Sequence, residues 1–140
     1  MTDRFEELLT ELGTVFGLKL KADKHHFCTL QVKEGVQVQL QSDASFEKLL
    51  LISKVAELPA GKFREQVLEA SLKANGLKDP RAGVFAYLAQ QNQLVFFQRY
   101  PFDILNGERL AALLGAFLDE VEAWKKAITS GLPCPPTMAS

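Results

Sequence analysis

Leu49-Leu50-Leu51-Ile52 and Leu94-Val95-Phe96-Phe97 are short runs in which every residue is apolar. Antiparallel strands usually alternate apolar and polar residues, because one face of the sheet meets the core and the other meets water. Strands that are apolar on both faces therefore need a cover on both faces. The helices predicted below are too few for that, so we expect the uncovered surface to bind protein, either a second copy of the chain or a client.

The two runs are the third and fifth strands of the order that hydrophobic periodicity predicts. The predicted elements are, in order, a helix over 3–16, strands over 27–32, 36–41 and 46–56, a helix over 62–75, strands over 83–89 and 94–100, and a helix over 108–130. This order indicates an α+β fold, in which helix, three-stranded meander, helix, hairpin and helix build a five-stranded antiparallel sheet packed by helices. We expect one domain over residues 1–132 and a flexible C-terminal tail over 133–140.

Two predicted helices carry further detail. Gly13 lies inside the first helix, where glycine costs about 1 kcal/mol relative to alanine, unless another backbone approaches closely at that point. The middle helix has one apolar face that includes Phe63 and Val67, and a narrower second face made by Leu68 and Leu72. This helix could cover the remaining face of the sheet, but its own second face would then lack a partner.

Composition excludes several classes of function. The 140 residues are 47% apolar and 24% charged, and their formal net charge is −1, so clustered basic charge for a nucleic-acid partner is absent. No apolar stretch approaches the roughly 20 residues that span a bilayer. The first residues carry acids where a signal peptide would carry lysines, so we expect a cytosolic protein with no membrane partner. Cys28 and Cys134 are expected to be free thiols.

The sequence contains no convincing catalytic or metal-binding motif. His25 and His26 lie near Cys28, but a zinc site needs three or four converging ligands, and neighbouring side chains of an extended segment point to opposite faces. The carboxylates lie on predicted helix exteriors. We therefore expect no cofactor, no metal and no enzyme activity; a small enzyme would require a cleft that gathers His25, His26 and a carboxylate.

Several short motifs together resemble the class I type III secretion chaperones, the Tir-chaperone-like family of Gram-negative bacteria. The resemblance covers about residues 5–128 and depends on the order and spacing of the motifs. They are Leu12-Gly13, Phe16-Gly17-Leu18 with Leu20, Asp23 followed by Cys28 and Leu30, Leu49/Leu51/Val55 followed by Leu58-Pro59, Leu72-Lys73-Ala74-Asn75, Gly83 and Trp124. His26 stands near a position where the family often has a turn glycine, and the net charge is milder than the acidity common in the family.

The resemblance implies a homodimer in the bacterial cytoplasm that uses no nucleotide or metal. Such a chaperone binds the N-terminal region of one or more secreted effectors, keeps it extended, and delivers it to the secretion apparatus. By position, the implied dimer contacts are Leu68, Leu72, Val84 and Phe85. The implied effector contacts are Phe5, Leu9, Phe16, Leu30, Val38 and Leu50. The alternative is a homodimeric binding or regulatory module of the same fold whose client is not secreted.

Overall fold

The computed structural model describes residues 4–24, 26–33, 36–43, 47–76 and 82–131. The elements are α1 (Arg4–Phe16), β1 (Phe27–Lys33), β2 (Val36–Ser42), β3 (Lys48–Glu57), α2 (Lys62–Asn75), β4 (Val84–Leu88), β5 (Gln93–Pro101), a 3-10 turn (Phe102–Ile104) and α3 (Gly107–Ser130). This order confirms the predicted α+β fold. The predicted tail, Cys134 and His25 lie outside the described residues, so their predictions stay untested.

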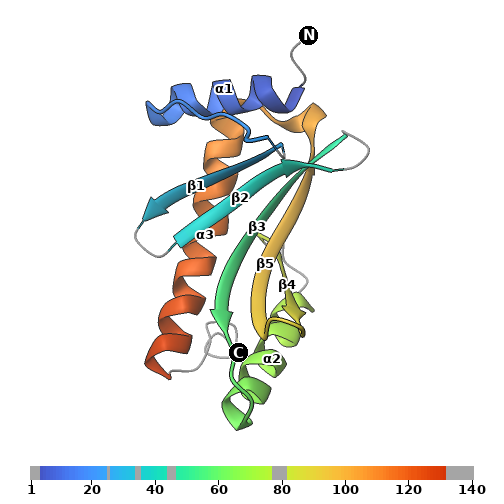
Figure 1. Cartoon of the computed structure of the whole chain (residues 1–140), viewed down its shortest axis with the longest axis vertical. Helices are drawn as coiled ribbons and strands as arrows, with labels where there is room; N and C mark the ends of the chain where they lie inside the picture. Colours follow the sequence, from blue (N-terminus) through green and yellow to red (C-terminus); the bar gives the residue numbers. More distant parts are fainter. Residues whose placement is uncertain (1–3, 25, 34–35, 44–46, 77–81, 132–140) are drawn as a thin grey trace.

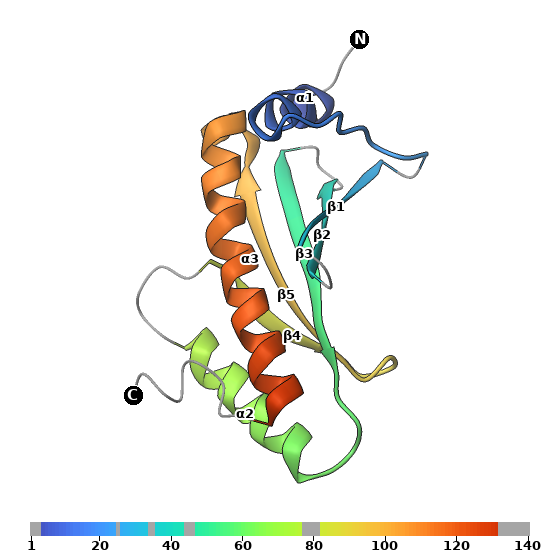
Figure 2. The same ribbon diagram turned by 90° about the vertical axis from the view of Figure 1, so that its left-hand side faces the viewer.

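The five strands form one antiparallel sheet in the order β1-β2-β3-β5-β4. The long helix α3 lies along one face, and α1 crosses its N-terminal end (Figure 1). Seen from the side, α2 lies at the far end of the sheet near β4, and among the described residues no helix covers the face opposite α3 (Figure 2). The possibility that the middle helix covers that face is therefore excluded. We call this uncovered side the open face.

Alternation along the strands separates a covered face from the open face. In β3, Leu49, Leu51 and Val55 are buried, whereas Leu50 and Ile52 are only half-buried. The centre of the core is aromatic: the ring centroids of Phe85 and Trp124 lie 4.1 Å apart, those of Phe85 and Phe96 lie 4.6 Å apart, and those of Phe96 and Phe117 lie 4.9 Å apart. Such pairs contribute beyond the apolar area that they bury.

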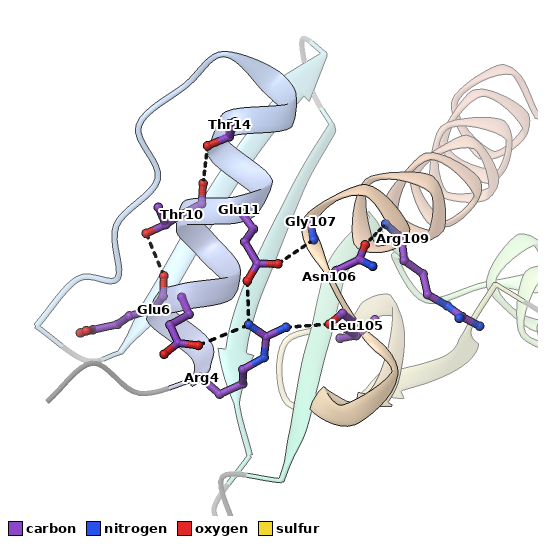
Figure 3. Close-up of polar contacts among 10 residues, drawn as sticks. Arg4, Glu6, Thr10, Glu11, Thr14, Leu105, Asn106, Gly107 and Arg109 are labelled. Atoms are coloured by element: carbon purple, nitrogen blue, oxygen red, sulfur yellow. Dashed lines mark hydrogen bonds and ion pairs between the residues drawn. The ribbon is translucent and has the colours of Figure 1, made fainter.

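A polar joint fixes α1 against the start of α3 (Figure 3). Arg4 donates from Nη1 to Glu11 Oε2 and from Nη2 to the Leu105 carbonyl, both at 2.7 Å, and the Gly107 N–H donates to Glu11 Oε1 at 3.2 Å. The hydrogen bond from Arg4 lowers the pKa of Glu11. A side chain at position 107 would lie 2.6 Å from the Glu11 backbone, so the glycine allows the two helices to touch.

Two backbone features agree with the sequence-based expectations. His26 has φ of 64°, the left-handed region that favours glycine, which fits a position where relatives often have a turn glycine. Gly13 is buried, and its carbonyl accepts a 2.9 Å hydrogen bond from the Leu18 N–H. A Cβ there would collide with the Leu18 carbonyl oxygen. The close backbone approach considered for Gly13 is thus made by the chain itself.

Candidate functional site: the open face and its edges

A row of side chains crosses the open face through all five strands. Successive cross-strand partners are Thr29, Gln39, Ile52, Phe97 and Val84, from β1, β2, β3, β5 and β4. The last three make an apolar band: Ile52 and Phe97 are half-buried, and Val84 is 39% exposed. The neighbouring row adds Phe27 and Leu50, both half-buried. Leu50, Ile52 and Phe97 of the two opening runs therefore face a surface without a helix, whereas Val95, on the same face as Phe97, is buried.

Polar side chains border this band without covering it. Gln37 donates to Gln31 at 3.1 Å and Gln39 donates to Gln41 at 3.4 Å, which confirms a glutamine-lined outer surface on the first hairpin. The guanidinium of Arg99 lies 5.5 Å from the centre of the Phe97 ring. The cation is attracted to the electrons of the ring and covers part of one face of Phe97.

The outer edge of the sheet at β4 is closed by a side chain. The Asn75 amide donates to the Phe85 carbonyl at 2.9 Å and accepts from the Phe85 N–H at 2.8 Å. Both backbone groups of Phe85 thus point away from β5, and Asn75 imitates one residue of a neighbouring strand. Unpaired strand edges are sites where another chain can add, so this contact closes the β4 edge at its middle.

The opposite edge, at β1, is closed only at its start. The Phe27 N–H donates to Asp23 Oδ1 at 3.0 Å, and the Asp23 N–H donates to the Phe27 carbonyl at 2.8 Å. Because backbone groups alternate between the two sides of a strand, those of Thr29 and Gln31 also point outward. Among the described residues they have no hydrogen-bond partner there. The open edge of the sheet therefore adjoins the open face.

A family model matches residues 7–125 and describes the Tir chaperone protein (CesT) family. The chain belongs to this family. No curated protein sequence matches the chain. In the part of the chain that the structure describes, no helix has both the length and the apolar character needed to cross a bilayer.

Several solved structures have the same fold. A chain of the HopA1–SchA chaperone–effector complex is 19% identical and superposes with a TM-score of 0.74, covering 89% of this chain and 94% of that one. A chain of the ExsC–ExsE complex is 24% identical, with a TM-score of 0.69 and coverage of 91% and 97%. A chain in the structure of the Yersinia pestis type III secretion chaperone SycH with a fragment of YscM2 is 16% identical. It superposes with a TM-score of 0.65, covering 84% of this chain and 97% of that one.

The implied dimer residues of this CesT-family chain lie on α2 and β4. Leu72 is 71% exposed, Val84 is 39% exposed and Leu68 is half-buried. Phe85 is only 4% exposed, because its ring lies between Phe96 and Trp124. Other large exposed apolar residues on the same two elements are Phe63 and Leu88, each 38% exposed. Phe85 thus belongs to the core, Leu68 packs against the core, and Leu72 and Val84 are exposed.

The implied effector residues fall into two groups. Four of them are buried in the core of the isolated chain and offer almost no side-chain surface to a partner: Phe5, Leu9, Leu30 and Val38. The other two are accessible. Leu50 is half-buried on the open face, and Phe16 is 38% exposed at the end of α1, near the exposed Val15 and Leu18. The turn after α1 encloses a hollow of 430 Å³ lined by Gly13 and Leu18 among others.

The structure gives no chemical role to the cysteine and histidine of the first hairpin. Cys28 is buried, and its burial, together with the negative charge of Asp23, raises the pKa of its thiol, so it packs as a small apolar residue. His26 is exposed. Within the described residues, no group of three or more His, Cys, Asp or Glu side chains could hold a metal ion.

Sequence reasoning missed the residues that close the sheet edges. Asn75 and Asp23 were each named as part of a family motif, with no role predicted for either side chain. Both side chains bond backbone groups of a neighbouring strand. The available signal was weak: Asn and Asp are the residues that most often bond backbone groups outside regular structure.

Proposed function

We propose that this CesT-family chain is a type III secretion chaperone of the bacterial cytoplasm that binds the N-terminal segment of secreted effectors. It keeps that segment extended and delivers it to the secretion apparatus. Family membership and the solved chaperone–effector complexes of the same fold support the general role. The single observation that carries the binding mode is the apolar open face beside an unpaired β1 edge.

An extended segment suits this surface because it has a backbone that can pair with the β1 edge and side chains that can cover the apolar band. The backbone of one part of the segment can pair with the outward-pointing groups of Thr29 and Gln31, and another part can cross the open face, where its side chains reach the apolar band of Ile52, Phe97 and Val84. Ordering a disordered segment costs about 2–5 kcal/mol or more, so the segment must bury a long apolar track. The closed β4 edge directs strand addition to the β1 edge.

The test is a proline substitution at the β1 edge. Thr29→Pro removes an N–H that points away from β2, so the β1–β2 pairing stays intact. We expect its affinity for an effector's N-terminal segment to fall by about tenfold, the equivalent of one to two backbone hydrogen bonds. Thr29→Val, which keeps the N–H, is the matched control. Equal binding by both variants, or no effector segment bound by the wild type, would refute the proposal.

We also propose that the chain forms a homodimer through the exposed apolar side chains of α2 and β4. A two-fold contact would bring this surface against its own copy. Leu72→Asp places a charge at a position that is 71% exposed in the isolated chain, so folding should be retained. Light scattering should then give a monomer for the variant and a dimer for the wild type. A folded variant that stays dimeric would remove α2 from the interface.

A further inference from the structure

β2 and β3 separate along their length. Their pairing ends at Gln39 and Ile52, although β2 begins at Val36 and β3 continues to Glu57. The two strands lie side by side at one end and diverge toward the other (Figure 1). Past the last pair, the Ser53 hydroxyl donates to the Gln37 carbonyl. We call the space between residues 36–38 and residues 53–57 the β2–β3 slot.

Two hollows occupy this slot, and both are lined by Lys125 of α3. The smaller has a volume of 360 Å³ and is lined by Gln37, Ser53 and Lys54, among others. The larger has a volume of 680 Å³ and reaches Val36 and Val55. Glu57, Glu122 and Lys126 line it too, so the far end of the slot is mixed in character. The two hollows share a lining residue and therefore adjoin each other.

The smaller hollow is positively charged. Lys54 approaches it from the open face and Lys125 from the side covered by α3, and no carboxylate lines it. The acid nearest along α3, Glu122, lines the larger hollow and pairs with Lys126 at 3.1 Å. Lys125 has no ion pair with any residue that the structure describes. Two lysines thus line one small space that has no carboxylate among its lining residues.

We propose that the β2–β3 slot binds an extended client segment that carries an aspartate or glutamate, with its carboxylate between Lys54 and Lys125. This inference rests on the proposed function and adds a charge requirement to it. A gap between two strands suits single side chains of an extended segment better than a helix of about 10 Å diameter.

The test selects peptides from a random dodecapeptide display library on the full chain and on variants of one lysine. Peptides enriched on the wild type should contain Asp or Glu, and Lys125→Glu should remove or reverse that preference. Arg109→Glu is the matched control, because Arg109 is an exposed cation of the same helix and lines neither hollow. If Lys125→Glu fails to fold, Lys125→Met replaces it in the test, because it removes the positive charge without adding an acid.

Synthetic versions of the selected peptides give the magnitude. Replacing the acid by its amide should weaken binding to the wild type about fivefold, and should leave binding to Lys125→Met unchanged. An acidic preference that survives in Lys125→Glu, or selected peptides without acids, would overturn the slot while leaving effector binding at the β1 edge intact. If neither peptides nor an effector segment bind the wild type, both proposals fail.

Discussion

Removing the Asn75 side chain should destabilise the fold, because this side chain closes the β4 edge of the sheet. Asn75→Ala deletes both hydrogen bonds to the Phe85 backbone, which are 2.8 and 2.9 Å long. Phe85 is 4% exposed, so water reaches its backbone poorly once the amide is gone. At about 0.5–1.5 kcal/mol net for each hydrogen bond, we expect a loss of about 1–3 kcal/mol in the free energy of unfolding.

Urea unfolding at a fixed protein concentration measures this loss, and concentration must be fixed because a dimer's stability depends on it. Gln66→Ala is the matched control, since Gln66 is an exposed residue of the same helix and should change stability by less than about 0.5 kcal/mol. Hydrogen exchange gives a second readout: the Phe85 amide should be protected in the wild type and lose protection in Asn75→Ala. Equal stability of the two variants, or an unprotected Phe85 amide in the wild type, would refute the reasoning.

Two further predictions concern α1. The lowered pKa of Glu11 means that its ionised form stabilises the fold above the ordinary value of 4.5, and that this contribution is lost as pH falls through the folded-state pKa. The stability difference between wild type and Glu11→Gln should therefore shrink below pH 4.5 in urea titrations, and a constant difference between about pH 3 and pH 7 would contradict this. Gly13→Ala should cost about 1–3 kcal/mol, because the methyl collides with the Leu18 carbonyl, whereas Gly115→Ala, with open space around it, should gain up to about 1 kcal/mol in the same assay.

Periodicity was enough to predict the elements of the fold and their order. The residues that recur at helical spacing on α3 are buried, and so are the apolar residues that alternate with glutamines on β2. They are Leu114, Phe117, Val121 and Trp124 on α3, and Val36 and Val38 on β2. These signals are local, because each follows from which side of one helix or strand meets the core. The segment 101–107 shows the limit: it was predicted as a plain connection, yet Phe102 and Leu105 are buried in it.

The candidate site was predicted less well, because it depends on which face of the sheet the helices leave open. Alternation shows that Leu49 and Leu50 lie on opposite faces, but it does not say which face α3 covers. For the same reason the implied effector residues divided into a buried group, such as Leu30 and Val38, and an accessible one that includes Leu50. The edge contact made by Asn75 joins residues that only the tertiary structure brings together.

The uncovered band also connects binding to stability. Ile52 and Phe97 are only half-buried and Val84 is exposed, so in the isolated chain they give up part of the free energy that full burial would provide, about 25 cal/mol for each Å². A partner that covers the band provides this free energy only to the folded state, since the unfolded chain has no such row of side chains. With the proposed client, the free energy of unfolding should therefore rise with the logarithm of one plus the ratio of free client concentration to Kd. An apolar face that makes the isolated fold less stable than it could be is, for the same physical reason, the face that can hold a client.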